Sequence, residues 1–280
     1  MLDTIKFSIR RLQANKIMML LVLAFLLISC GFYFTYAWFA DDDKVTNHFE
    51  GNRLDVELAE VFDSPMNWQP GTTTVKEIRA VNTGIMPALV RISLYESLLM
   101  FKVDVTDQSG NGNLMISQQA NDPVVKLDDV KTWEAAAKQG GTYYLNNHYY
   151  LAKEAKIGNQ ATGKNQYMLE DKNRESSEFN YFEIMFNRLI NQSSESFTKD
   201  YWRYEKGYFY YSEVLMPGEQ SEPIVSQVLL SAQAPNRLKG SLYQLTPHLE
   251  GHDVTPSIFA EWQLESNSEM QALYQTYMKE

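Results

Sequence analysis

The fold is decided by residues 72–95, which read TTTVKEIRAVNTGIMPALVRISLY. Residues 72–81 are rich in β-branched side chains, and residues 87–95 form a second apolar run of the same kind. Asn82, Thr83 and Gly84 stand between the two runs, and these residue types favour turns. Two short apolar runs joined by such a turn predict two neighbouring β-strands.

The same pattern continues on both sides of this pair. Residues 53–61 alternate polar and apolar side chains, which is typical of a half-buried strand. Further strands are predicted over residues 181–190, 201–215 (an aromatic hairpin that turns at 205–207), 223–231 and 238–249. Short strands with turn residues between them predict a mainly β fold, an antiparallel β-sandwich of the jelly-roll or immunoglobulin-like kind.

The sandwich is predicted in two parts, residues 38–103 and 179–265, because residues 104–178 have a different composition. There Gly, Asn, Gln and Lys are frequent, and we expect a mixed insertion or small subdomain with a helix over 128–138. A hairpin over 143–151 is predicted to turn at Asn146 and Asn147. Residues 266–280 predict a short C-terminal amphipathic helix, with Ser266 and Glu269 as its capping box.

Residues 1–37 predict a signal peptide or an N-terminal membrane anchor. Four basic residues precede an uncharged run over residues 17–40, and Asp41 follows it. This order predicts a cytoplasmic N-terminus and an apolar segment long enough to span a bilayer. Cleavage between Ala37 and Trp38 and retention of the segment both fit the pattern. Cys30 fits a lipidation motif, but ten uncharged residues follow it, which favours an ordinary apolar position.

The composition restricts the class of function. The formal net charge of -10 argues against nucleic acid as a partner, because attraction to phosphate needs a basic surface. The single cysteine excludes a disulfide-stabilised scaffold. Together with residues 1–37, this leaves an exported protein, or one anchored through residues 17–37 with its C-terminal part outside.

No catalytic, cofactor or metal site is predicted. The chain has no His-Glu-x-x-His motif, and Pro247 and Gly251 disfavour the helix that would place His248 and His252 side by side. Residues 107–113 resemble the first half of a calcium loop, but Gln118 stands where a bidentate glutamate is needed. We interpret that stretch as a turn and expect a non-enzymatic protein.

The aromatic hairpin allows two interpretations. In a strand, Trp202 and Tyr204 share one face, and Tyr208 and Tyr210 share one face. These four residues form either an exposed aromatic face that binds a glycan or a protein, or one core face with cross-strand pairs.

Several stretches together resemble a known group. Residues 36–41 read YAWFAD, and VTN at 45–47 and NRLDV at 52–56 follow. VNTG at 81–84 leads to ALVRI at 88–92, and residues 207–219 read GYFYYSEVLMPGE. These stretches resemble exported proteins of the TasA/camelysin type in Gram-positive bacteria, and among them the alternate signal-mediated exported proteins. Trp38 and Ala40 depart from the Tyr or Phe and the Thr that are usual in that junction.

The resemblance implies a jelly-roll sandwich that a SipW-type signal peptidase releases to the surface or to a biofilm matrix. It also implies fibre assembly, with the chain itself or with other matrix or pilus subunits, by donation of the mature N-terminal segment. The donor would be residues 38–53, with Val45, Phe49 and Leu54 filling pockets of a neighbour, because an extended segment can pair with an open sheet edge. In the alternative interpretation this segment is the first strand of its own sheet.

The sequence therefore predicts an exported, non-enzymatic surface or extracellular-matrix protein, in which a fibre or pilus-associated role rests on the resemblance. Three alternatives come from other classes. They are a glycan- or protein-binding sandwich at the cell surface, a membrane-anchored accessory of a surface system, and a camelysin-like metalloprotease, which the missing zinc motif disfavours.

Overall fold

The computed structural model describes residues 54–62, 68–106, 112–158, 166–175, 177–187 and 199–278. All of them belong to the unit Gly51–Glu280, which is separate from Met1–Glu50. The predicted cleavage site at Ala37 and Trp38, the donor residues Val45 and Phe49, and the apolar segment 17–37 lie outside the described residues. Among the described residues, no helix is long and apolar enough to cross a membrane.

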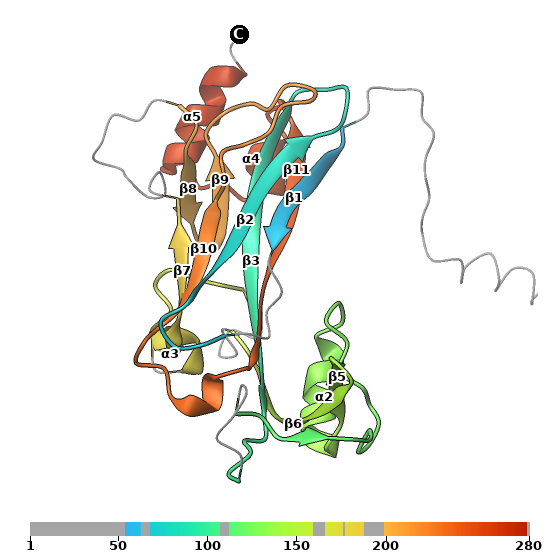
Figure 1. Cartoon of the computed structure of the whole chain (residues 1–280). Helices are drawn as coiled ribbons and strands as arrows, with labels where there is room; N and C mark the ends of the chain where they lie inside the picture. Colours follow the sequence, from blue (N-terminus) through green and yellow to red (C-terminus); the bar gives the residue numbers. More distant parts are fainter. Residues whose placement is uncertain are drawn as a thin grey trace, which may run out of the picture. The chain divides into compact units, whose positions relative to one another are not determined.

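Two antiparallel sheets form the unit (Figure 1). The four-stranded sheet has the order β1 (Val56–Phe62), β2 (Thr73–Asn82), β10 (Val225–Leu230) and β7 (Phe182–Phe186). The seven-stranded sheet contains β3 (Ala88–Phe101), β4 (Met115–Ile116), β5 (Thr142–Leu145), β6 (His148–Ile157), β8 (Trp202–Glu205), β9 (Tyr208–Tyr211) and β11 (Leu242–Asp253). The predicted mainly β, antiparallel sandwich is confirmed.

Strand β3 lies at the centre of the larger sheet. On one edge it pairs with β11 from Ala88 to Leu99. On the other edge it pairs with β9 at Arg91 and Ile92, and further on with β6 from Ser97 to Phe101. One continuous strand thus joins the sandwich to residues 104–178.

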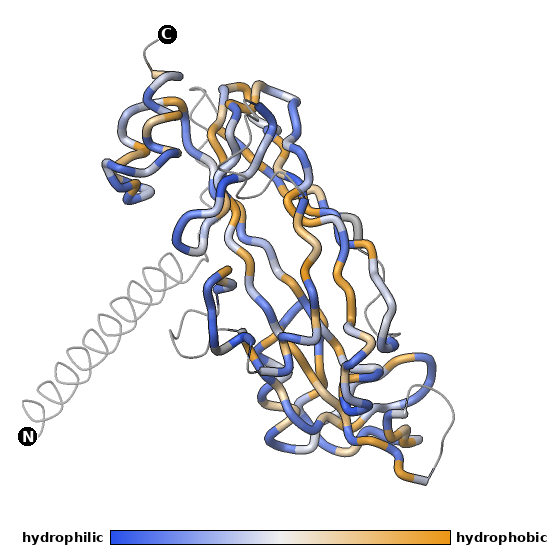
Figure 2. The backbone as a smooth tube through the Cα atoms, turned by 90° about the vertical axis from the view of Figure 1, so that its left-hand side faces the viewer, coloured by the Kyte–Doolittle hydropathy of each residue, from blue (hydrophilic) through white to orange (hydrophobic). Residues whose placement is uncertain are grey.

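The side chains of β3 enter three separate cores because successive residues of a strand point to opposite faces. Residues such as Ile92 and Leu94 pack between the two sheets in the main core. On the opposite face, Leu89 packs under the C-terminal helices, and Leu99 and Phe101 pack against the insertion. The alternation of apolar and polar residues along the strands can be followed in Figure 2.

Aromatic rings fill one end of the main core. Phe182 of β7 stacks on Tyr243 of β11, with ring centroids 4.3 Å apart. Trp68 meets both rings edge-on, at 5.6 Å from Phe182 and 6.1 Å from Tyr243. Because one partner comes from each sheet, these contacts hold the two sheets together.

The insertion contains the elements that the sequence predicts. Helix α2 (Lys131–Gln139) buries Trp133 and ends at Gly140, whose φ of 71° suits a left-handed cap. The hairpin of β5 and β6 turns at Asn146 and Asn147, with φ of 49° and 62°. Two left-handed residues in a two-residue loop match the right-handed twist of the strands, so the predicted turn is confirmed.

Short helices connect and complete the sandwich. They are α3 (Lys172–Glu175), η3 (Glu178–Tyr181), η4 (Asn236–Leu238), α4 (Ile258–Glu261) and α5 (Glu269–Tyr277). The predicted C-terminal helix is confirmed as α5, but its cap is Ser268, whose Oγ accepts a hydrogen bond from Gln271 N at 3.2 Å. The prediction of Ser266 as the cap is wrong, because the helix begins at Glu269 and Ser266 precedes the capping position by two residues.

A buried ion pair fixes α3 against β3. Glu96 faces the interior of the sandwich with 2% of its side chain exposed. Arg174 donates to both of its oxygens, at 2.8 and 2.9 Å, and also to the carbonyl of Phe182. Tyr243 donates its hydroxyl to Glu96 at 2.7 Å. Burial raises the pKa of Tyr243 well above its ordinary value, and the charge of Glu96 adds to this, so the hydroxyl stays a donor.

The substitution Glu96→Gln tests this network. It leaves the Arg174 guanidinium largely buried without its counter-charge, so we expect the free energy of unfolding to fall by roughly 3–5 kcal/mol. Urea unfolding of the full chain measures the change. Glu77→Gln is the matched control, because its pair with Arg79 is partly exposed and worth less than about 1 kcal/mol. Equal losses in the two variants would contradict a special role for Glu96.

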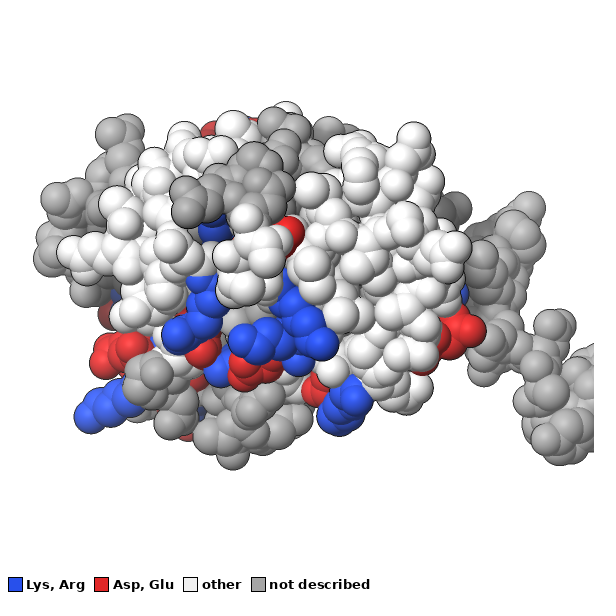
Figure 3. All heavy atoms as spheres, turned by 60° about the horizontal axis from the view of Figure 1, so that its bottom comes forward, with Lys and Arg blue, Asp and Glu red and all other residues white. Residues whose placement is uncertain are grey.

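A second group of charges lies at the end of the unit that contains β6 and α3. Figure 3 shows this end, where Lys and Arg side chains gather with acidic side chains between them. Lys156 of β6 donates to Glu178 at 2.5 Å, and Arg237 of η4 contacts the other oxygen at 3.2 Å. Burial alone would raise the pKa of Glu178, but its hydrogen bonds, first of all with Lys156, and the charges of Lys156 and Arg237 together outweigh burial and lower the pKa.

This lowered pKa predicts an acid-dependent part of stability. A carboxyl whose pKa is lower in the folded state stabilises it above the unfolded pKa of about 4.3, and the effect is lost as pH falls through the folded pKa. Thermal unfolding from pH 7 to pH 3 should therefore show a gap between the native chain and Glu178→Gln that closes in acid. Glu175→Gln, at an exposed position of α3, is the control, and an equally large change in that variant would contradict the assignment to Glu178.

Candidate functional site

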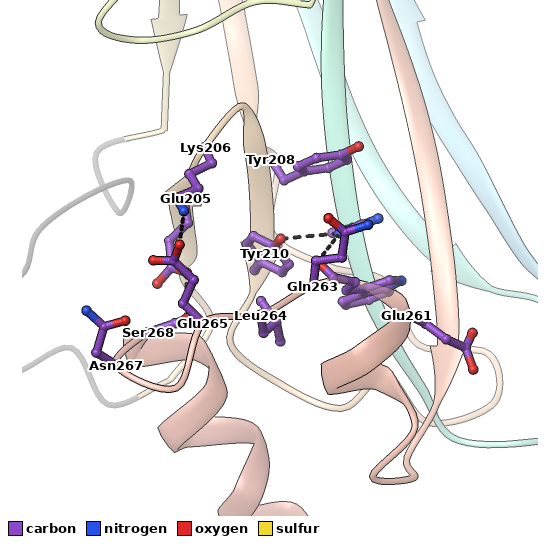
Figure 4. A pocket seen from close by; sticks show the side chains of 12 residues that line it. Glu205, Lys206, Tyr208, Tyr210, Glu261, Gln263, Leu264, Glu265, Asn267 and Ser268 are labelled. Carbon is purple, nitrogen blue, oxygen red and sulfur yellow. Dashed lines mark hydrogen bonds and ion pairs between the residues drawn. The ribbon is translucent and has the colours of Figure 1, made fainter.

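A cavity of about 650 Å³ lies between the β8–β9 turn, α4 and the α4–α5 connection (Figure 4). Three of its lining residues, Arg91, Tyr210 and Trp262, are buried. The more exposed part of its lining consists of Glu205, Lys206, Tyr208, Glu261, Gln263, Leu264, Glu265, Asn267 and Ser268. The cavity is therefore formed on the outer face of the larger sheet, where the C-terminal helices cover it.

Arg91 ties together the elements beneath the cavity. It lies on β3 opposite Glu250 of β11, and its Nη2 and Nε donate to Glu250 Oε2 at 2.7 and 3.2 Å. Its Nη1 donates to the hydroxyl of Tyr210 at 3.3 Å and to the carbonyl of Trp262 at 3.2 Å. The guanidinium carbon lies 4.0 Å from the ring centroid of Tyr208 and 4.8 Å from that of Trp262.

These contacts use the flat, multiply donating shape of a guanidinium. Burial raises the pKa of Tyr210, although the hydrogen bond and charge of Arg91 act in the opposite direction. Tyr210 therefore stays protonated and accepts from Arg91 as a neutral hydroxyl. In this way Arg91 links β3, β9, β11 and α4.

We expect Arg91→Lys to lower the free energy of unfolding by about 2 kcal/mol. An ammonium keeps the charge but cannot make the hydrogen bonds and the ring contacts at the same time. Urea unfolding followed by tryptophan fluorescence is the measurement, since Trp262 lies against the substituted residue. Arg79→Lys on β2 is the control, and a loss as large as that of Arg91→Lys would contradict the assignment.

The exposed side of the cavity joins the β8–β9 turn to the start of α5. Glu205 accepts a hydrogen bond from Ser268 Oγ at 2.5 Å and a long one from Met270 N at 3.5 Å. A carboxylate at this position also suits the positive end of the helix. Lys206, the next residue of the turn, forms an ion pair with Glu265. The geometry of this side is thus set by contacts within the chain.

Two amide side chains at the cavity differ from these residues in their hydrogen bonding. Within the described part of the chain, the side chains of Gln263 and Asn267 have no hydrogen-bond partner, and both residues are exposed. Gln263 also has a φ of 53°, a left-handed conformation that is costly for any residue with a side chain except in special turns. It follows α4 at the position where glycine is the common choice.

A polar cluster around His252 lies beside the cavity. The ring Nδ1 is 2.7 Å from the carbonyl and 2.8 Å from the carboxylate of Asp253. The Nε2 is 3.2 Å from Ser257 Oγ and 3.3 Å from Glu261 Oε2. Oxygen acceptors thus lie beside both ring nitrogens, and the imidazole joins the end of β11 to α4. The cluster holds the β11–α4 connection, and the cavity is lined by Glu261 but not by Ser257.

The four aromatic residues of the hairpin do not form the exposed face that was one of the two predictions. Trp202 and Tyr204 belong to the main core, and Tyr210 is buried under the C-terminal helices. Tyr208 alone of the four is half-buried, and it lines the cavity. A common exposed platform is therefore wrong, because both faces of the β8–β9 hairpin are covered. The alternative of a core face with cross-strand pairs describes Trp202 and Tyr204, which contact Tyr211 and Phe209.

The remaining predicted residues that the structure describes do not line the cavity. Leu54 is half-buried against the main core of its own chain. His248 is exposed, and its Nδ1 is 3.9 Å from Glu250 Oε1. The described residues contain no group of three or more His, Cys, Asp and Glu side chains arranged to hold a metal ion. Residues 107–111 of the calcium-like stretch lie outside the described part.

Sequence reasoning missed Arg91, Trp262 and Gln263 as residues of a site. One signal was present for Arg91, since it is the charged residue within the apolar run 87–95. A charge in a strand that is buried on both faces must find partners, so it marks a place where other polar groups meet. The positions of Trp262 and Gln263 at the cavity are set by α4, a four-residue helix for which the sequence shows no distinct pattern.

Comparison with known proteins gives no neighbour: no family model matches this chain, and neither a curated protein nor a solved structure matches it. The resemblance to TasA/camelysin-type exported proteins therefore stays a prediction from the sequence motifs.

Proposed function

We propose that this chain is an exported, non-enzymatic protein of the cell surface or extracellular matrix that assembles with copies of itself through its N-terminal segment. In this proposal a SipW-type signal peptidase cuts after Ala37. The basic, apolar and acidic succession of residues 1–43 supports export. The position of β1 supports the assembly.

Strand β1 is well placed to be exchanged between copies. It is the first strand of the described chain and an edge of the four-stranded sheet, and within that sheet β2 is its single described partner. Leu54, Val56 and Leu58 are half-buried against the main core. A terminal edge strand can therefore leave its own sheet and make the same contacts in a neighbour, at little cost in free energy.

The residues before β1 would continue the same pairing. Val45 and Phe49 precede Leu54 in an extended donor segment, in which apolar side chains point into a neighbour's core. Repetition of a head-to-tail contact of this kind produces an open filament rather than a closed dimer.

Paired cysteines test where β1 lies. Glu57 of β1 and Val81 of β2 are directly opposite, so a disulfide can join cysteines at these positions. Two variants of the full chain are co-expressed and oxidised, one with Glu57→Cys and the other with Val81→Cys. Both also carry Cys30→Ser, and each has a different tag. We expect a disulfide between the two differently tagged chains. The same mixture with Thr246→Cys in place of Val81→Cys is the control, because exposed Thr246 lies on β11.

A single chain that carries both cysteines tests whether β1 pairs within its own sheet. If it closes an internal disulfide while the mixture stays uncrosslinked, β1 belongs to its own sheet and the proposal is overturned. Mass spectrometry of the N-terminus of protein from the natural host completes the test. A start at Trp38 in large species agrees with the proposal, whereas an intact Met1 in a membrane-bound monomer would identify an anchored accessory.

A further inference from the structure

We infer that the cavity between the β8–β9 turn, α4 and α5 is a binding site for a neutral saccharide. The inference does not depend on assembly through β1, and either can fail without the other. It rests on the charges at the cavity, on its unpaired polar groups and on the conformation of Gln263.

The charges disfavour an anionic ligand. The two cations at the cavity are already neutralised, Arg91 by Glu250 and Lys206 by Glu265. Glu205 and Glu261 add negative charge to the lining. A phosphate or a carboxylate would therefore meet repulsion without a free cation to bind it.

The aromatic groups disfavour a cationic ligand. The rings of Tyr208, Tyr210 and Trp262 surround one position where a cation could be held by their faces. The guanidinium of Arg91 already occupies this position, at 4.0 Å from the nearest ring centroid. A second positive charge would be repelled by the first, so the ligand is expected to be neutral.

The free polar groups match a polyhydroxylated ligand. The amides of Gln263 and Asn267 each provide two donors and an acceptor, and the carboxylate of Glu205 has lone pairs beyond those used by Ser268 and Met270. Neighbouring hydroxyls of a sugar both donate and accept, so they can satisfy such groups together. The half-buried ring of Tyr208 provides apolar area against which the C–H groups of a sugar ring can pack.

The conformation of Gln263 is the independent observation. A left-handed φ of 53° is easily adopted by glycine and is unfavourable for glutamine. In the described part of the chain, no hydrogen bond of its side chain offsets this cost. Strained residues of this kind gather at binding sites, where the side chain is needed for a ligand. The amide of Gln263 therefore serves something outside the chain, and Gln263 is one of the residues that line the cavity.

Two substitutions and one control test the inference. The full chain, kept in a detergent without a sugar head group, is applied to an array of neutral and acidic oligosaccharides. We expect neutral members to bind, and Gln263→Gly and Asn267→Ala each to weaken that binding at least tenfold. Gln263→Gly should also raise the unfolding temperature by about 2–4 °C, because glycine relieves the left-handed residue. Gln233→Ala, which removes an exposed amide elsewhere, should change neither binding nor stability.

Loss of binding in a variant that is more stable than the native chain cannot result from unfolding, so it would assign the amide to the ligand. The inference is overturned if no neutral oligosaccharide binds, if acidic members bind more tightly than neutral ones, or if binding survives in both Gln263→Gly and Asn267→Ala.

Discussion

The structure depends on the burial of β3 on both faces and on both edges. Nearly every side chain of this strand is buried, and its backbone is paired with β11 on one edge and with β9 and β6 on the other. Its side chains contribute to the main core, to the insertion and to the packing of α4 and α5. Because successive residues of a strand point to opposite faces, one segment can contribute side chains to all three cores.

A strand in this position can carry a charge only where partners satisfy it fully. Glu96 faces the interior of the sandwich, where Arg174 of α3 and Tyr243 of β11 bind its two oxygens. Arg91 lies on the opposite face, and its donors are taken by Glu250, Tyr210 and Trp262. Each charge therefore attaches a short helix that has little stability of its own to the central strand. Through the carbonyl of Trp262, Arg91 helps to position α4 beside the cavity.

The sequence is informative wherever a local pattern determines the structure. The alternation in β2 and β10, the Asn146–Asn147 turn, helix α2 and helix α5 follow from side chains that are neighbours along the chain. The site could not be predicted in this way, because it joins residues 91, 208, 262 and 267, which meet only in the folded molecule. The prediction of an exposed aromatic face was wrong for a related reason. The sequence of the hairpin shows which residues share a face, but it does not show that a helix covers the second face.

The pairing of β3 with β11 has a consequence for how the chain reaches this fold. Ala88 pairs with Asp253 and Leu99 pairs with Leu242, so the central strand meets its longest partner only after nearly the whole chain has been made. Contacts so distant along the sequence form slowly, because a long loop must close first. During synthesis, which proceeds from the N-terminus, an apolar stretch of strand waits without its neighbour and is prone to aggregate. Residues 88–101 therefore stay without their longest partner strand until β11 has been made.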